Sequence, residues 1–488
     1  MKWALYNILF ALVYPFLLPG FLLRMLKRGG YAARMGDRFA LYPEGFFGAN
    51  RPLFDSHAKR SANRTLDQSE QSNNSSFVWI HAVSVGEVQV AGQLMREWRK
   101  VEPSVRFCFS TTSSTGWKMA EKEVKGNGED GGDVLIYNPL DFPNFVKSAL
   151  RTVRPRAIVL TESEIWPNFI LQAKKMGIPL FLINARVSDR SAPRYKAAKW
   201  FFGDVLSSFT RIFAQSELDK ARLVAAGAPS GIVDVTGSFK FDVAHRNEAK
   251  ERELKEWVFG NGSVPDVKTK ILLGGSTWPG EDEVLLKIYK RVLSSIEQSN
   301  DPNNRTLLVI APRHFEKADA VEANIRKAGF GCIRRSRNQT IDQSEQSKQS
   351  EQSEQSEQSN NVFLADTTGE LMGLYGIADV VFVGKSLCAH GSQNMIEPCL
   401  CGKPTFVGPY TENFRPVMSD LLAADAIVQV KDADELERGI VELFGSLTSG
   451  QETASPLLAD ELGARASAAV ARRCGVVSKC VAAIRSAL

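Results

Sequence analysis

Short apolar runs alternate with segments of helical spacing along almost the whole chain of 488 residues. Such alternation predicts parallel β-sheets covered by helices on both faces, an α/β fold. The chain is too long for one ordinary core, so we expect two domains, separated near the charged segment 243–268. The expected strands are 77–81, 105–110, 134–137, 157–160, 180–183, 211–214, 232–236, 271–274, 306–310, 332–334, 362–364, 380–383, 405–407 and 426–430.

Two stretches rich in Ser, Gln and Glu interrupt this alternation, at residues 62–76 and 336–361. Both contain the hexamer DQSEQS, and each precedes an expected strand. Segments of this composition cannot bury apolar surface, so we expect disordered surface insertions. A partner-binding tail is the alternative, but no apolar anchor residues interrupt the repeat.

Residues 3–23 carry no charged side chain, and a basic cluster follows them: Arg24, Lys27, Arg28, Arg34 and Arg38. A run of this length can span or enter a bilayer, and the basic flank predicts that the rest of the chain is cytoplasmic. Pro15, Pro19 and Gly20 interrupt the run, so whether it spans the bilayer or only enters it stays open. A cleaved signal peptide is the alternative, but the basic cluster stands where a small-residue cleavage site would be.

Two expected strands lead directly into acidic loops. The strand at 77–81 is followed by Glu87, and the strand at 157–160 is followed by Glu162 and Glu164. Open α/β sheets bind ligands at the carboxyl ends of their strands, so this pair of loops suggests a general base with a partner. The alternatives are structural, because an acid in the first helical turn is favoured by the helix dipole and Glu164 could cap the following helix.

A lysine near the expected domain junction is a further candidate. Lys240 lies between Phe239 and Phe241, and it could neutralise a phosphate or a sugar carboxylate. The alternative is a lysine whose stem covers the two aromatic rings.

The second half has features of a nucleotide site. Arg313 follows an expected strand and suits a phosphate or a pyrimidine edge, although it could be an ordinary surface arginine. Thr367 and Glu370 have the spacing of a capping box, whose exposed amides can also bind an anion. The glycines of Gly384-Lys385-Ser386 and Gly391-Ser392 precede an expected helix and suit a phosphate, and Glu397 could accept hydrogen bonds from ribose hydroxyls.

Composition and spacing exclude other classes of site. The net charge of +5 is spread along the chain and does not indicate a nucleic-acid partner. The seven cysteines form no CxxC pair, so we expect reduced thiols and no zinc site. Asp432 and Asp434 have DxD spacing, but an acidic helix start explains them better. We therefore expect neither a metal nor a cofactor.

Several segments resemble the signature segments of one family, in the expected order: HAVSVGE (81–87), TESEIWPN (161–168) and GSFKFD (237–242). The family is that of the Kdo transferases, inner-membrane glycosyltransferases of lipopolysaccharide synthesis that transfer 3-deoxy-D-manno-octulosonic acid (Kdo). The resemblance covers nearly the whole chain outside the two insertions. It implies the GT-B fold, in which two Rossmann-like domains with parallel sheets face a cleft. The implied parts are an anchor at 1–24, an acceptor-binding domain at 25–245, a linker at 246–268 and a CMP-sugar-binding domain at 269–488.

The resemblance also implies the reaction and its residues. An inverting enzyme would move Kdo from CMP-Kdo to a hydroxyl of the lipid A precursor on the cytoplasmic face of the inner membrane. Glu87 would be the base, and Glu162 and Lys240 would support the transition state. The implied CMP-binding residues are Pro312, Arg313, Thr368, Gly369, Glu370, Asn394, Met395, Ile396 and Glu397.

The chain departs from the family pattern at three places near the implied donor site. Lys385 stands where the family has the second glycine of Gly-Gly-Ser, Trp278 replaces the histidine of Ser-Thr-His, and Met395-Ile396 replaces Pro-Leu. Two alternatives stay open, the second of them because of these departures. One is another membrane-associated GT-B enzyme that uses a UDP-sugar, and the other is a scaffold without catalytic activity.

Overall fold

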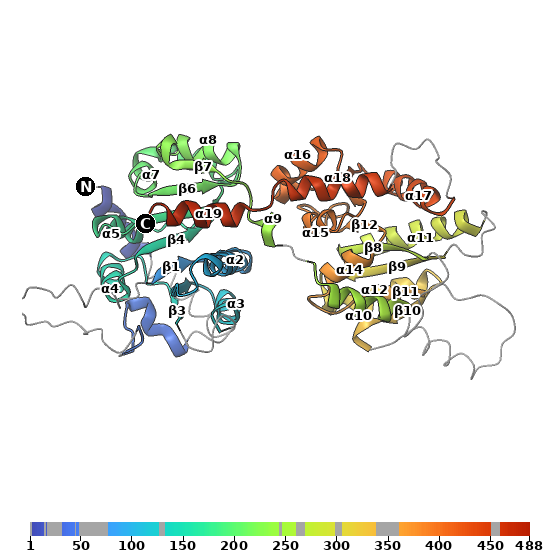
Figure 1. The fold of residues 1–488 in the computed structure, drawn as a ribbon, viewed down its shortest axis with the longest axis horizontal. Coiled ribbons are helices and arrows are strands. Elements are labelled where there is room, and N and C mark those ends of the chain that lie inside the picture. The colour runs from blue at the N-terminus through green and yellow to red at the C-terminus, as the bar shows by residue number, and fades with distance from the viewer. Residues whose placement is uncertain are drawn as a thin grey trace, which may run out of the picture. The chain divides into compact units, whose positions relative to one another are not determined.

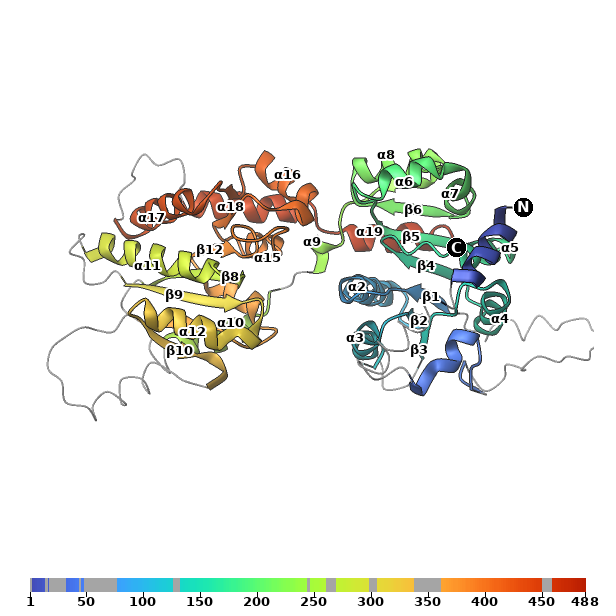
Figure 2. The same ribbon diagram turned by 180° about the vertical axis from the view of Figure 1, so that it is seen from behind.

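The computed structural model describes residues 2–13, 16, 32–43, 45–47, 77–125, 132–243, 246–259, 269–297, 305–337, 361–449 and 459–488. The predicted insertion at 62–76 and residues 338–360 of the second insertion lie outside the described residues. The chain folds into two compact units, Met1–Val243 with Gly475–Leu488, and Ala244–Cys474 (Figures 1 and 2).

A seven-stranded parallel sheet forms the centre of the first unit, in the order β3-β2-β1-β4-β5-β6-β7. Its strands are β1 (Val78–His81), β2 (Phe107–Thr111), β3 (Val134–Tyr137), β4 (Ala157–Thr161), β5 (Leu180–Ala185), β6 (Arg211–Ala214) and β7 (Val233–Val235). Alternate residues of β1 point to opposite faces, with Trp79 in one core cluster and Val78 and Ile80 in the other. Both faces are buried, which explains why the strands have continuous apolar sequences.

Helices cover both faces of this sheet. One core cluster includes residues of α4 (Pro143–Val153), α5 (Pro167–Lys175), α7 (Lys199–Leu206) and α8 (Glu217–Ala225). The other includes residues of α2 (Val85–Val101), α3 (Ser114–Lys125) and the C-terminal helix α19 (Val476–Arg485). The unit also contains η1 (Ala32–Phe39), α6 (Ala192–Ala197), η3 (Ser230–Ile232) and α9 (Lys240–Val243).

The second unit has its own seven-stranded parallel sheet, in the order β10-β11-β9-β8-β12-β13-β14. Its strands are β8 (Thr269–Thr277), β9 (Arg305–Pro312), β10 (Gly331–Arg334), β11 (Asn361–Leu364), β12 (Val380–Val383), β13 (Thr405–Val407) and β14 (Val428–Gln429). Its helices are α10 (Glu248–Phe259), α11 (Glu281–Glu297), α12 (Ala318–Lys327), α14 (Leu371–Ile377), α15 (Ile396–Leu400), α16 (Arg415–Ala423), α17 (Ala433–Ser449) and α18 (Ala459–Ala471), with short turns at η4 (Phe315–Lys317), η5 (Arg335–Arg337) and η6 (Glu412–Phe414).

Each predicted strand corresponds to a strand of the structure, and the α/β class with two parallel-sheet units is confirmed. The predicted boundaries differ in two places. Helix α10 lies inside the segment predicted as a linker and belongs to the second unit, where Leu254 is buried. Residues 475–488, predicted in the second domain, belong to the first unit, because α19 buries Val477, Val481 and Ile484 in its core.

The N-terminal apolar run is described only in part. Residues 2–13 are helical, while residues 14, 15 and 17–31 lie outside the described part. Among the residues that the structure describes, no helix is both long enough and apolar enough to cross a membrane.

Candidate functional site

The two acidic loops meet at one point of the first sheet. Strands β1 and β4 are hydrogen-bonded neighbours, with His81 opposite Leu160. From β1 the chain continues to β2 and β3 on one side, and it returns to β4 on the other. The carboxyl ends of β1 and β4 are therefore the topological switch point of this sheet, where open α/β sheets bind ligands.

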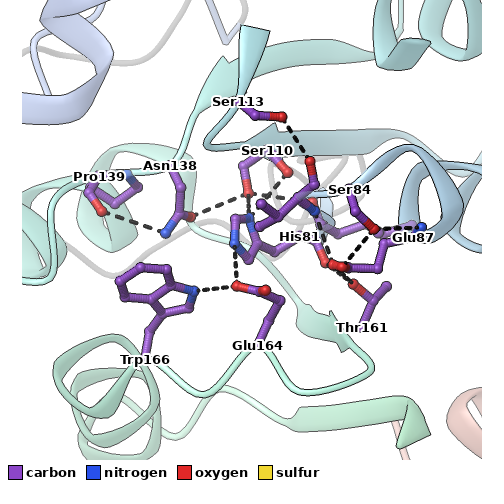
Figure 3. Close-up of polar contacts among 12 residues, drawn as sticks. His81, Ser84, Glu87, Ser110, Ser113, Asn138, Pro139, Thr161, Glu164 and Trp166 are labelled. Carbon is purple, nitrogen blue, oxygen red and sulfur yellow. Dashed lines mark hydrogen bonds and ion pairs between the residues drawn. The ribbon is translucent and has the colours of Figure 1, made fainter. Parts of the chain in front are cut away.

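Glu87 lies in the first turn of α2, and its side chain is 9% exposed. Ser84 is the N-cap, and its hydroxyl accepts a hydrogen bond from the Glu87 amide at 3.3 Å. The Glu87 carboxylate in turn accepts three hydrogen bonds: from the Val83 amide at 3.0 Å, the Ser84 hydroxyl at 2.8 Å and the Thr161 hydroxyl at 3.0 Å (Figure 3). The first-turn position is confirmed, and Thr161 links Glu87 to the end of β4.

Glu162 follows β4 in the left-handed region, with a φ of 50°. Burial raises the pKa of its carboxyl group, the charge of Glu87 raises it further, and the guanidinium of Arg186 opposes both. The Arg186 Nε donates to Glu162 Oε2 at 2.7 Å. A non-glycine residue held in this strained region at the end of a strand is typical of functional sites.

Lys240 belongs to the same charged group. Burial lowers the pKa of its ammonium group, and the charge of Glu162 opposes that shift. Asn184, at the end of β5, holds the two segments together. Its Oδ1 accepts from the Phe239 amide at 3.1 Å, and its Nδ2 donates to Glu162 Oε1 at 3.4 Å. The structure thus brings the predicted residues Glu87, Glu162 and Lys240 together.

The ring of His81, the last residue of β1, lies between Ser110 of β2 and Glu164 of the second acidic loop (Figure 3). Its ring is fully buried, with Nδ1 2.9 Å from the Ser110 hydroxyl and Nε2 3.7 Å from Glu164 Oε2. Trp166 Nε1 donates to the same Glu164 oxygen at 2.9 Å. Burial alone would raise the pKa of Glu164, but the His81 and Trp166 contacts lower it overall. Glu164 therefore holds the loop and does not cap the following helix, whose N-cap residue is Trp166, directly before Pro167.

Asp242, the last residue of GSFKFD, fastens the C-terminal helix to the first unit. Its carboxylate accepts hydrogen bonds from the Gly475 amide at 2.6 Å and the Val477 amide at 2.7 Å. These hydrogen bonds satisfy amides at the start of α19. Together with the burial of its apolar side chains, they hold residues 475–488 in the first unit.

The second sheet has its switch point between β8 and β12, which are hydrogen-bonded neighbours. The Gly384-Lys385-Ser386 loop, whose glycine suggested a phosphate site, has backbone amides that are already engaged. The fully buried carboxylate of Glu281 already accepts from the amides of the loop. These donors are Lys385 at 2.8 Å, Ser386 at 3.1 Å, Leu387 at 3.1 Å and Cys388 at 3.3 Å, joined by the Trp278 amide at 2.8 Å.

The predicted CMP-binding residues gather at the carboxyl edge of this sheet but in different environments. Pro312 ends β9 and is followed by the exposed Arg313. Thr368 and Gly369 are exposed in the loop after β11. Met395 and Ile396 are fully buried, so their side chains serve the core. Glu397 accepts a hydrogen bond from Asn394 Nδ2 at 3.0 Å, and burial raises its pKa.

Glu370 is held in a network of ion pairs. Arg335 Nη2 lies 3.0 Å and Lys250 Nζ 3.3 Å from its Oε1. Burial alone would raise the pKa of Glu370, but Arg335 and Thr367 lower it overall. The predicted capping box is wrong in detail: Thr367 does donate to Glu370, but helix α14 begins at Leu371 with Glu370 itself as N-cap.

Sequence reasoning missed Arg186, Asn184 and Glu281. A usable signal existed for Arg186, because it directly follows the buried strand β5 at the same sheet edge as Glu162. Within the described ranges, no group of three or more His, Cys, Asp or Glu side chains is placed to hold a metal ion. Asp432 and Asp434 lie at the start of α17, where Asp432 Oδ1 accepts from the Glu435 amide at 2.8 Å, so the predicted acidic helix start is confirmed.

The arrangement of two parallel-sheet units also occurs among solved structures. A glycosyltransferase from Rickettsia africae has a similar fold over 85% of this chain and 99% of its own, with a TM-score of 0.52 and 12% sequence identity.

Sequence comparison defines the family. Residues 34–243 match the family described as 3-deoxy-D-manno-octulosonic-acid transferase (kdotransferase). The 3-deoxy-D-manno-octulosonic acid transferase of Haemophilus influenzae is 32% identical over 375 residues, 76% of this chain and 80% of that protein. The enzyme of the same name from Bordetella pertussis is 32% identical over 359 residues, 73% of this chain and 76% of that protein. The chain belongs to the Kdo transferase family and is a glycosyltransferase, and its predicted function in Kdo transfer for lipopolysaccharide synthesis is confirmed at the level of the family.

Proposed function

We propose that this chain transfers Kdo from CMP-Kdo to a hydroxyl of a lipid A precursor at the cytoplasmic face of the inner membrane, with inversion at the anomeric carbon. The observation that carries the proposal is the charged group at the β1–β4 switch point, where Glu87, Glu162, Lys240 and Arg186 act on one another. Two carboxylates and two cations suit a reaction that moves a proton and an acidic sugar.

In this proposal Glu87 is the general base. A carboxylate offers about four acceptor sites, and the described residues fill three of those on Glu87. Two of these hydrogen bonds fall on Oε2 and one on Oε1, so the remaining site on Oε1 would take the proton of the acceptor hydroxyl. The three donors fix the carboxylate before substrate arrives, which removes the cost of orienting it.

The bond changes follow from this arrangement. The acceptor oxygen attacks the anomeric carbon of CMP-Kdo, its proton passes to Glu87, and the bond from that carbon to the phosphate oxygen breaks to release CMP. A single displacement inverts the configuration. Lys240 and Arg186 would neutralise the acidic sugar, and Glu162 would hold both cations in place through its charge and the Arg186 hydrogen bond.

The second unit would bind the donor nucleotide. The residues proposed for CMP are Pro312, Arg313, Thr368, Gly369, Glu370, Asn394, Met395, Ile396 and Glu397, of which Met395 and Ile396 could take part only through their backbone. The named relatives of this chain support Kdo as the transferred sugar.

The N-terminal helix supports a membrane-bound enzyme whose helix lies in the bilayer surface. One face of residues 2–13 packs on the first unit: the rings of Trp3 and Phe201 are 4.9 Å apart, and Tyr6 donates to Asp141 at 3.0 Å. Asp141 also accepts from the Asn168 and Phe169 amides at the start of α5, directly after the Glu162–Trp166 loop. The helix is therefore tied to the segment that carries the proposed acceptor site.

The opposite face of this helix is apolar and exposed. Leu5, Ile8, Leu9 and Leu12 are 51–60% exposed and follow helical spacing. Trp200 is 61% exposed and lies on the neighbouring helix α7. Its backbone carbonyl accepts a hydrogen bond from Lys2 Nζ at 2.8 Å. Four exposed basic residues precede it in the sequence: Arg190, Arg194, Lys196 and Lys199. An apolar helix face with an aromatic and a basic rim suits an anionic lipid surface.

Flotation with vesicles containing phosphatidylglycerol tests the membrane part. Replacing Leu5, Ile8, Leu9 and Leu12 together by serine should reduce the bound fraction more than tenfold, because each buried leucine contributes about 1.5–3 kcal/mol. The matched control replaces four scattered exposed apolar residues, Val101, Met176, Leu218 and Leu422, and should float like the wild type. Equal flotation of both variants would contradict the interfacial helix.

Incubation of the purified chain with CMP-Kdo and tetra-acylated lipid A precursor, followed by mass spectrometry, tests the reaction. The expected product gains at least one Kdo unit, and CMP is released in equal amount. A panel of UDP-sugars is the comparison. Transfer from a UDP-sugar without transfer from CMP-Kdo would replace the proposed donor, and no transfer from any donor would favour the scaffold.

A further inference from the structure

Two of the departures from the family pattern contact each other at the second switch point. Trp278 follows β8 and Lys385 follows β12, and these strands are neighbours in the sheet. The Lys385 Nζ lies 5.1 Å from the centroid of the Trp278 ring. His314, from the loop after β9, meets the edge of the same ring at a centroid distance of 4.8 Å. Three loops at the ligand-binding edge thus form one basic and aromatic cluster.

We propose that Lys385 binds the phosphate of the donor nucleotide and that Trp278 holds the lysine in position. This inference rests on the proposed CMP-sugar donor and adds to it a phosphate contact from the side chain of Lys385. A lysine over an aromatic face keeps its charge while losing little freedom on binding an anion. Both side chains are half-buried, so a ligand can reach them.

A phosphate at this loop would need a side-chain donor such as Lys385, because the backbone amides of the loop already donate to another group. Five backbone N–H groups around Lys385 and Trp278 point at the carboxylate of Glu281. They cannot cradle a phosphate at the same time, and the buried negative charge beneath the loop opposes an incoming anion. A cation at the surface of the loop offsets that charge and supplies the missing donor.

The backbone supports a functional reason for the lysine. Lys385 has a φ of 56°, in the region that glycine adopts freely and other residues adopt with strain. Gly384 beside it cannot be replaced, because a Cβ there would lie 2.3 Å from the Ser276 carbonyl oxygen. A glycine at position 385 would adopt this backbone conformation without strain, so the stability of the fold does not account for a lysine there.

Calorimetric titration of the full chain with CMP and with cytidine tests the phosphate contact. Lys385→Met should weaken CMP binding by about ten- to one-hundredfold, the loss typical of a hydrogen bond to a charged group, and leave cytidine binding unchanged. Lys385→Arg should restore most of the affinity. The matched control is Lys290→Met, because Lys290 also lies over a ring, 5.7 Å from the centroid of Phe330. Phe330 precedes β10, at the opposite edge of the sheet, so CMP binding should not change.

Two further variants separate function from stability. Lys385→Gly should weaken CMP binding like the methionine variant while Tm stays equal or rises, because glycine relieves the left-handed strain. Trp278→His should weaken CMP binding about three- to tenfold, and this loss should vanish in the Lys385→Met background. CMP binding within twofold of wild type in Lys385→Met would overturn the inference alone. A wild-type chain that binds no CMP would overturn the proposed donor and this inference with it.

Discussion

Replacing Glu87 by glutamine separates a catalytic base from a helix-capping acid. A glutamine can keep the geometry, because its oxygen can accept from the Val83 amide and the Thr161 hydroxyl while its amide donates to the Ser84 hydroxyl. The loss of charge at the helix start and of charge-assisted hydrogen bonds should lower the free energy of unfolding by about 2 kcal/mol. The loss of the proton acceptor should lower kcat by about 100- to 10,000-fold.

The first unit offers a closely matched control at Asp219. This acid also stands in the first turn of its helix, 7% exposed, and accepts from an N-cap serine, Ser216, and from a loop amide, that of Val187. Asp219→Asn should therefore cost a similar free energy of unfolding, but it should lower kcat far less than Glu87→Gln, because Asp219 binds the amide after Arg186 and offers no acceptor for the substrate proton.

The assay is kcat at saturating donor and acceptor, with urea unfolding of the same preparations. In addition, the charge of Glu87 raises the pKa of Glu162, so Glu87→Gln should move the titration of Glu162 to lower pH. A Glu87→Gln enzyme that keeps more than half of the wild-type rate would refute the base. So would an Asp219→Asn enzyme that loses as much activity as Glu87→Gln.

Four other outcomes are expected. Arg186→Met should lower kcat/KM by about 10- to 100-fold and raise the pKa of Glu162 further. The free energy of unfolding should change by less than about 1 kcal/mol, because Arg186 is largely exposed. An unchanged kcat/KM would remove Arg186 from the site. Glu281→Gln should lower the free energy of unfolding by about 3 kcal/mol, since its amide would face backbone N–H groups, whereas the exposed Glu283→Gln on the same turn should not. Burial raises the pKa of Asp141 to about 7 from 3.8, so the folded state binds this proton more tightly and wild-type stability should fall as pH rises from 4 through 7; Asp141→Asn should flatten that slope in urea unfolding at a series of pH values. Deleting residues 341–359 should leave activity and Tm nearly unchanged, because this segment has no apolar residue after Ile341 and the closure entropy of a loop changes by only about 0.6 kcal/mol per halving of its length. A large loss of activity would show specific contacts.

The sequence alone determined the strands and the edge of each sheet that carries polar residues. Burial on both faces leaves a continuous apolar run for every parallel strand, and a polar residue that ends such a run must lie at the carboxyl edge. Glu87, Glu162 and Arg313 could be found in this way, because each lies in the loop or first helical turn after a strand.

Only the tertiary structure decided which strand ends lie side by side at these edges. Strand order makes β1 adjacent to β4 and β8 adjacent to β12, although each pair is separated by two or more other strands in the sequence. The hydrogen bond from Thr161 to Glu87, the binding of the Gly384–Cys388 loop by Glu281 and the contact of Lys385 with Trp278 all depend on that order. So does the return of α19 to Asp242 in the first unit. Local sequence patterns indicate whether a residue is buried. They do not indicate which distant residue lies beside it, because such contacts form only when the packed sheet brings separate loops to one edge.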